Sequence, residues 1–117
     1  MILSASKAQL LIIDIQEKLA PAMSDAGPVI AHSQRLITAA RHFGVPVTIS
    51  EQYPGGIGPT VDVLREAAGR TARVFDKMTF SCAQDPAITD HLAQVREEAG
   101  RNQIVITGIE AHVCVLQ

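Results

Sequence analysis

Three side chains in this sequence could together form a catalytic nucleophile: Asp14, Lys77 and Cys114. Asp14 directly follows the first apolar run of the chain, Lys77 ends the third, and Cys114 comes shortly after the fourth. A thiol becomes nucleophilic when a base takes its proton and a nearby cation stabilises the thiolate. An aspartate, a lysine and a cysteine that meet at one place would supply the base, the cation and the nucleophile.

Each of these residues also has an ordinary structural explanation. An aspartate at a strand-to-helix turn often caps the following segment, which could be the role of Asp14. Lys77 could be an exposed surface lysine, and Cys114 could be a small buried hydrophobic residue, as free cysteines commonly are. Taken singly, the structural explanations are favoured. Taken together at one site, the three residues favour catalysis.

The segments that must position these residues predict an α/β fold. Four apolar or β-branched runs are expected to form strands: residues 8–13, 45–50, 72–77 and 103–108. The first run lacks alternation, which suits a strand buried on both faces. Strands that alternate with helices predict a parallel sheet with right-handed crossovers. Because sites in such sheets form beyond the carboxyl ends of the strands, the three reactive residues are expected at one edge.

Glycine, proline and capping residues predict where the helices begin and end. The first helix is expected within residues 27–44. Its apolar face comprises Val29, Ile30, Ile37, Ala40 and Phe43. The glycine- and proline-rich segment 51–60 predicts a loop without regular structure, after which Thr60 caps a short helix that ends at Gly69.

The segment "DPAITDHLAQVREEAG" predicts the clearest helix of the chain. Asp85 is the expected cap, Pro86 occupies the first turn, and Gly100 ends the helix. Its apolar stripe comprises Ile88, Leu92, Val95 and Ala99.

Length and composition limit the classes of function. The chain has 117 residues, 47% of them hydrophobic and 19% charged, which is typical of one globular domain. A net charge of -2 gives no reason to expect nucleic acid or an anionic membrane as a partner. The longest apolar run is too short to span a bilayer, and the start of the chain lacks a signal-peptide pattern. We therefore expect a cytoplasmic protein with reduced cysteines.

Four stretches of the sequence carry a resemblance to a known family: "LLIIDIQ", "EQYPGGIGPTV", "DKMTFS" and "TGIEAHVCV". Together they resemble the isochorismatase-like cysteine hydrolases, and most closely the isochorismatase domain-containing branch. The resemblance implies a three-layer, doubly wound parallel sheet in which the four strands have the order 3-2-1-4. It also implies that Asp14, Lys77 and Cys114 form the catalytic triad.

The same resemblance implies further parts of an active site. The family has a cis peptide bond that corresponds here to Ile109–Glu110, and the amides of Glu110 and Cys114 would form an oxyanion hole. Gln16, Tyr53 and Phe80 are expected to contribute to the substrate pocket.

Two contrasts within the family indicate the chemistry. Members that cleave an enol ether lack the cysteine, so its presence at Cys114 favours amide hydrolysis of a small molecule through a thioester. Nicotinamidases of the family bind a metal through an Asp-x-His-x-x-x-His cluster after the second strand. This sequence has Glu51, Gln52 and Tyr53 there and no histidine nearby, so neither a metal nor another cofactor is expected. Family members commonly form homo-oligomers, and we expect one here.

The resemblance covers nearly the whole chain, but the family continues with a helix and further strands beyond the position of Gln117. We therefore expect residues 1–117 to form an isochorismatase-like domain that lacks the family's C-terminal part. This leaves a second hypothesis open, a binding or scaffold protein that keeps the fold without catalysis. A dinucleotide-binding domain is disfavoured, because the first strand is followed by "DIQEKLAP" and no G-x-G-x-x-G turn.

Overall fold

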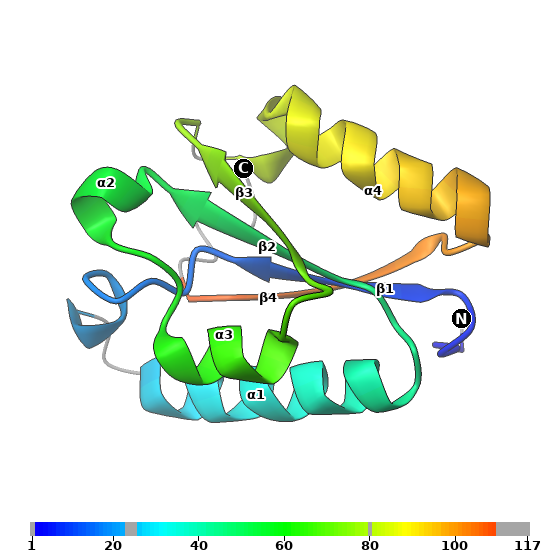
Figure 1. Ribbon diagram of the computed structural model, residues 1–117, viewed down its shortest axis with the longest axis horizontal. Coiled ribbons are helices and arrows are strands. Elements are labelled where there is room, and N and C mark those ends of the chain that lie inside the picture. The colour runs from blue at the N-terminus through cyan, green and yellow to red at the C-terminus, as the bar shows by residue number, and fades with distance from the viewer. Residues whose placement is uncertain (1, 23–25, 80, 110–117) are drawn as a thin grey trace.

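The computed structural model describes residues 2–22, 26–79 and 81–109. The strands are β1 (Ala8–Ile13), β2 (Val47–Gln52), β3 (Arg73–Lys77) and β4 (Gln103–Gly108). The helices are α1 (Ala26–His42), α2 (Pro54–Ile57), α3 (Asp62–Ala68) and α4 (Pro86–Ala99). Two short 3₁₀ turns, η1 (Ala20–Ala22) and η2 (Cys82–Gln84), complete the described elements (Figure 1).

The four strands form one parallel sheet in the order β3-β2-β1-β4, which confirms the predicted topology. β1 pairs with β2 on one side and with β4 on the other, and all six of its residues are buried. The continuous apolar run therefore predicted the central strand correctly. Since all strands are parallel, their carboxyl ends meet at one edge of the sheet.

Helices cover both faces of the sheet, so the predicted three layers are present. α1 and α3 lie on one face and α4 lies on the other (Figure 1). The first core cluster includes Leu10 and Ile12 of β1, and the second includes Leu11 and Ile13, because successive side chains of a strand point to opposite faces. Burying a leucine or isoleucine fully contributes about 1.5–3 kcal/mol, so β1 anchors both cores.

The segment after β2 differs from the prediction. β2 continues through Gln52, and residues Pro54–Ile57 form the single turn α2, with proline in its first turn. Thr60 does not cap α3, whose N-cap is Val61 without a side-chain cap. The amide and hydroxyl of Thr60 instead donate to Glu51 Oε2 at 2.7 and 2.8 Å. A buried carboxylate needs such donors, and because Thr60 donates to Glu51 its side chain does not cap α3.

The helix predictions were correct in their capping and partly wrong in their buried faces. Asp85 accepts a hydrogen bond from the Ile88 amide at 3.2 Å, and Gly100 adopts the left-handed conformation at the end of α4. Ala99 is exposed, so the predicted stripe of α4 is not buried along its whole length. Phe43, which lies one residue beyond the end of α1 at His42, is 64% exposed.

β4 is the outermost strand on one side of the described sheet, and β3 is the outermost strand on the other. The burial of β4 alternates, and Ile104 and Ile106 are 45% and 48% exposed. No helix within the described residues is long and apolar enough to cross a membrane.

Candidate active site

Asp14 and Lys77 meet at the carboxyl edge of the sheet. Asp14 follows β1, and its amide donates to the Ser50 carbonyl oxygen at 3.1 Å. Lys77 is the last residue of β3, and its Nζ lies 2.8 Å from Asp14 Oδ2 across the end of β2. Their side chains are 1% and 0% exposed, respectively. The sequence-based expectation that these two residues come together is therefore confirmed.

The ammonium group of Lys77 donates three hydrogen bonds within the described structure. Its acceptors are Asp14 Oδ2 at 2.8 Å, Gln52 Oε1 at 2.9 Å and the Thr79 carbonyl oxygen at 3.0 Å. A buried ammonium is tolerated only when it is paired and hydrogen-bonded. Lys77 is thus a fixed internal cation, which excludes an ordinary surface lysine.

The carboxylate of Asp14 is held at both oxygens. Oδ1 accepts a hydrogen bond from Ser50 Oγ at 2.7 Å, and Oδ2 accepts from Lys77. Neither of these bonds caps a helix, so the alternative role of Asp14 as a cap is not seen. Each carboxylate oxygen has two lone pairs, which leaves acceptor capacity for a further proton. The backbone of Asp14 has φ 55°, a left-handed conformation that is uncommon outside glycine and tends to occur at functional sites.

Gln16 fixes the loops beside this pair. Its Nε2 donates to the carbonyl oxygens of Gln52 at 2.9 Å and Gly58 at 2.6 Å, and its Oε1 accepts from the Gln52 amide at 2.7 Å. These contacts join the end of β2 to the segment after α2. They give the buried Gln16 a structural role, and its contact with a substrate stays a prediction.

Tyr53 lies next to the end of β2 and is half exposed. Its amide donates to the Lys77 carbonyl oxygen at 2.9 Å, and its ring lies over Gly56, where an added Cβ would overlap ring atoms. Its backbone is left-handed, with φ 39°. Tyr53 is therefore held near the Asp14–Lys77 pair in a defined orientation, and its part in a substrate pocket stays a prediction.

Several predicted site residues lie outside the described residues: Phe80, Glu110 and Cys114. The triad, the oxyanion hole and the cis bond before Glu110 are therefore not described as a geometry. The register of the sheet nevertheless shows where the chain leaves β4, because Gly108 at the end of β4 pairs with Ile13 at the end of β1. Asp14 and Ile109 consequently leave neighbouring strands at the same edge.

Two residues of this region did not enter the sequence-based prediction of the site. Ser50 is completely buried on β2, and Cys82 is buried at the start of η2. Burial raises the pKa of the Cys82 thiol, while a hydrogen bond with Ser50 and the charge of Lys77 oppose part of this rise. Cys82 is thus a protonated thiol at neutral pH. The polar Ser50 within the apolar run "VPVTIS" was the signal that could have indicated a site residue.

The position after β2, where the sequence was compared with a metal-binding histidine cluster, is occupied by other contacts. Glu51 Oε2 accepts hydrogen bonds from Thr60 and lies 3.7 Å from Arg65 Nη1. Across residues 2–22, 26–79 and 81–109, no group of three or more histidine, cysteine, aspartate or glutamate side chains could hold a metal ion. The expected absence of a metal stays a prediction for the whole chain.

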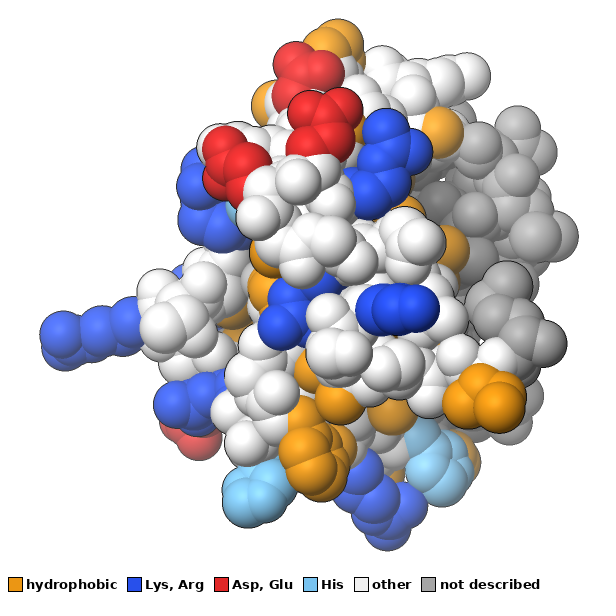
Figure 2. Space-filling model, turned by 90° about the vertical axis from the view of Figure 1, so that its right-hand side faces the viewer, with side chains coloured by type: hydrophobic (Ala, Val, Ile, Leu, Met, Phe, Trp, Pro, Cys, Tyr) orange, Lys and Arg blue, Asp and Glu red, His pale blue; other side chains and the backbone are white. Residues whose placement is uncertain are grey.

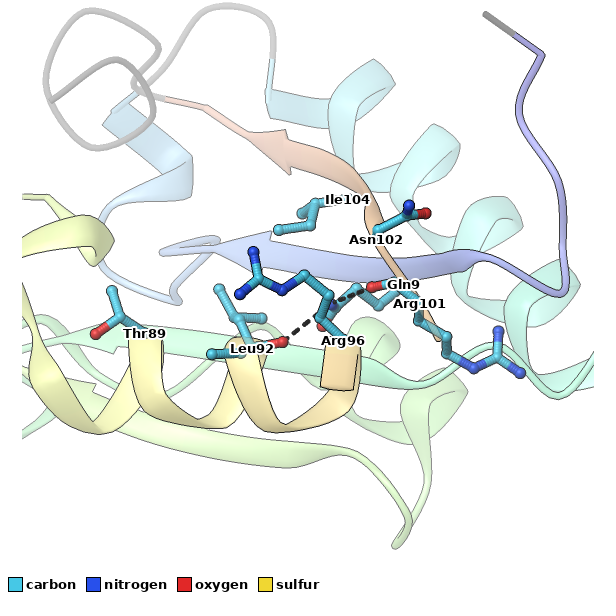
Figure 3. A pocket seen from close by; sticks show the side chains of 8 residues that line it. Gln9, Thr89, Leu92, Arg96, Arg101, Asn102 and Ile104 are labelled. Carbon is cyan, nitrogen blue, oxygen red and sulfur yellow. Dashed lines mark hydrogen bonds between the residues drawn. The ribbon is translucent and has the colours of Figure 1, made fainter. Parts of the chain in front are cut away.

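A groove of about 300 Å³ lies at the opposite end of the sheet (Figure 3). Gln9 is buried beside it and donates to the carbonyl oxygens of Leu92 at 3.2 Å and Arg101 at 2.9 Å. Arg101 itself donates to the carbonyl oxygens of Ala5 at 2.7 Å and Ala8 at 2.9 Å. The space-filling view of the molecule from this side shows basic side chains spread among acidic and hydrophobic ones (Figure 2). These contacts hold the amino ends of the strands together, and the groove is separate from the Asp14–Lys77 pair.

The model of the isochorismatase domain matches residues 8–117, which is nearly the whole chain. The chain belongs to the isochorismatase family. Isochorismatase domain-containing protein 1 of Danio rerio is 36% identical over 115 residues, covering 98% of this chain and 38% of that protein. Isochorismatase family protein 1A of Dictyostelium discoideum is 36% identical over 117 residues, covering 98% of this chain and 55% of that protein.

Solved structures of the family agree with the fold. The MAR1 ribonuclease of Caenorhabditis elegans has 37% identity and a TM-score of 0.86, covering 98% of this chain and 56% of that one. An isochorismatase from Pseudomonas putida has 22% identity and a TM-score of 0.82, covering 97% of this chain and 62% of that one, which shows the shared fold alone. The chain thus spans between 38% and 62% of the length of these relatives.

Proposed function

We propose that this protein is a cysteine hydrolase that cleaves a small amide through a thioester formed on Cys114. The observation that carries the proposal is the buried Asp14–Lys77 ion pair at the carboxyl edge of the sheet. Buried ion pairs are weak devices for stability, since desolvation of two charges can exceed their attraction. In open α/β sheets, functional sites form beyond the carboxyl ends of the strands, which is where this pair lies. Family membership supports the same role, and β4 directs the chain toward this edge.

The proposed reaction begins with proton transfer from the Cys114 thiol to the Asp14 carboxylate. The thiolate attacks the amide carbonyl carbon, and the resulting oxyanion is stabilised by the backbone amides of Glu110 and Cys114. The C–N bond then breaks, and Asp14 returns its proton to the departing amine. Lys77 keeps the carboxylate in place and offsets negative charge throughout.

The second half of the reaction releases the acyl group. Asp14 accepts a proton from a water molecule, which attacks the thioester carbonyl carbon. The carbon–sulfur bond breaks, Asp14 returns the proton to the Cys114 thiolate, and the product leaves as a carboxylic acid, so that both side chains regain their starting states. Tyr53 and Phe80 are proposed to line the pocket in which the small-molecule substrate lies.

A screen of small amides, nitrogen-containing rings and esters tests this proposal. We expect turnover of at least one amide, and an added acyl mass on the Cys114 peptide when the reaction is quenched. Cys114→Ala is the blank and should show neither. A folded protein without turnover and without acylation would favour the alternative, a binding or scaffold protein that keeps the isochorismatase fold.

A second candidate is RNA cleavage, because the C. elegans relative of 37% identity is named a ribonuclease. General acid–base cleavage of RNA would use Asp14 without a covalent thioester. The net charge of -2 is unfavourable for binding a polyanion. RNA cleavage that persists in Cys114→Ala and disappears in Asp14→Asn would favour this candidate over amide hydrolysis.

A further inference from the structure

We propose that Ser50 is a positioning residue that fixes the direction of the Asp14 carboxylate. This inference rests on the proposed function and assigns to Ser50 a part in it. Ser50 would not touch the substrate. Its effect would act through Asp14, by keeping one carboxylate lone pair aimed at the proton that is transferred.

The location of Ser50 argues against a role as a simple filler of the core. Ile13, Ser50 and Phe75 form one row across the sheet, and this row faces α4. Ile13 of this row belongs to the second core cluster with Leu11 and Ile88, and Phe75 packs against that cluster. Burying a hydroxyl among apolar side chains costs free energy unless the hydroxyl is hydrogen-bonded. The Ser50 hydroxyl is hydrogen-bonded to the Asp14 carboxylate and also to the Cys82 thiol, and of these two partners Asp14 carries the charge.

Two hydrogen bonds connect Ser50 and Asp14. Ser50 Oγ donates to Asp14 Oδ1 at 2.7 Å, and the Asp14 amide donates to the Ser50 carbonyl oxygen at 3.1 Å. Lys77 holds the other carboxylate oxygen, Oδ2, at 2.8 Å. The carboxylate is thus fixed from β2 at one oxygen and from β3 at the other. Without the hydroxyl it would be held at Oδ2 alone and could pivot about that contact.

The loss of the hydroxyl has two opposing consequences. A carboxylate that loses a donor becomes a slightly stronger base, which favours proton transfer. A misplacement of about 1 Å, however, can reduce a reaction rate about 100-fold. Since proton transfer responds only partly to a change in basicity, we expect the loss of direction to dominate, with a net reduction of about tenfold.

Alkylation of Cys114 by iodoacetamide at neutral pH tests the proposal, with each cysteine followed separately by mass spectrometry of its peptide. Ser50→Ala should react about tenfold more slowly at Cys114 than the unaltered protein. Ser50→Thr keeps a hydroxyl and should react within about threefold of the unaltered protein. Ser33→Ala is the matched control, because Ser33 is also completely buried and its hydroxyl is bonded to Thr107 Oγ1 at 2.8 Å. This control should leave the rate unchanged.

Different results separate the inference from the function on which it rests. An unchanged rate in folded Ser50→Ala, together with slow alkylation in Asp14→Asn, would overturn the role of Ser50 alone. Slow alkylation of Cys114 in the unaltered protein, no faster than that of Cys82, would overturn the proposed function itself. If Ser50→Ala does not fold, the alkylation rates of Cys114 in Ser50→Thr and Ser50→Val are compared instead. Threonine and valine have nearly the same shape, and only threonine carries a hydroxyl. Equal rates in that pair would contradict the inference, and a slower valine variant would support it.

Discussion

Asp14 and Lys77 form an ion pair that is almost completely withdrawn from solvent. Its contacts extend to Ser50, which bonds to the carboxylate, and to Gln52, which accepts from the ammonium. Removing one partner of such a pair leaves an uncompensated charge in the interior. At the scale of single residues, the site is therefore expected to be sensitive to each of its charges separately.

Lys77→Met should lower the free energy of unfolding by about 3–5 kcal/mol, because it leaves the Asp14 carboxylate buried without its cation. Urea unfolding followed by circular dichroism measures this change. Arg96→Met is the control, since Arg96 and Glu97 form an exposed pair at 3.9 Å and exposed pairs contribute less than about 1 kcal/mol.

The double variant Asp14→Asn, Lys77→Met sharpens this prediction. Removing both charges should cost less than the sum of the two single changes, because no buried charge then remains unpaired. Additive losses of stability would show that the two side chains act independently, contrary to the ion pair described for them.

His91 on α4 is expected to make the stability of the protein depend on pH. Burial, and secondly the positive charge of Arg73, lower the pKa of His91 below its ordinary value of 6.5. The unfolded chain then binds more protons than the folded protein as pH falls below about 6.5, so stability decreases through this window toward the lowered pKa. His91→Gln should flatten the dependence of the urea midpoint on pH between about 7 and 5. Arg73→Gln should reduce it partly, and an unaltered pH dependence in His91→Gln would contradict the assignment.

At the scale of elements, the sequence correctly predicted the features that depend on hydrophobic pattern and on capping residues. The uninterrupted run of β1 indicated a central strand, and Asp85 with Pro86 marked the start of α4. Contacts between distant segments were harder to predict. Thr60 is a residue type that often caps a helix, but its amide and hydroxyl donate to the buried Glu51 instead. Phe43 fitted the apolar stripe predicted for the first helix, but α1 ends one residue before it. Ser50 was not recognised because its importance depends on Asp14, which precedes it by a whole helix.

The short helix α2 determines where Tyr53 lies, and its two glycines are not equivalent. An added Cβ at Gly56 would overlap the Tyr53 ring, whereas nothing lies within 4 Å of one at Gly55. Gly56→Ala should therefore displace the ring and change its fluorescence, which is readily followed because the chain has one tyrosine and no tryptophan. Gly55→Ala should leave the fluorescence unaltered. Identical spectra for both variants would show that Gly56 does not seat the ring.

At the scale of the whole molecule, exposed apolar side chains favour self-association. Leu3, Leu36 and Phe43 line a groove of about 200 Å³ and are 61%, 41% and 64% exposed. Apolar surface of this kind often marks an interface.

We expect the protein to form a homo-oligomer in solution. Size-exclusion chromatography with light scattering should give a mass above the 12.5 kDa of one chain. Leu36→Gln combined with Phe43→Gln should lower that mass if this groove is the interface. Met78→Gln is the control, because Met78 is 73% exposed at the other end of the sheet and should not change the mass. A stable monomer of the unaltered protein would contradict the expectation.

The most direct test of the catalytic assignment is the alkylation rate of Cys114 in the unaltered protein and in Asp14→Asn, with Cys82 as the internal reference. Asparagine keeps the shape of the side chain but cannot take the thiol proton. We predict that Cys114 reacts much faster than the buried Cys82 at neutral pH, and that Asp14→Asn slows it about 100-fold, the lower range of a general-base contribution. An unchanged Cys114 rate in a folded Asp14→Asn protein would contradict the proposal that Asp14 activates this cysteine.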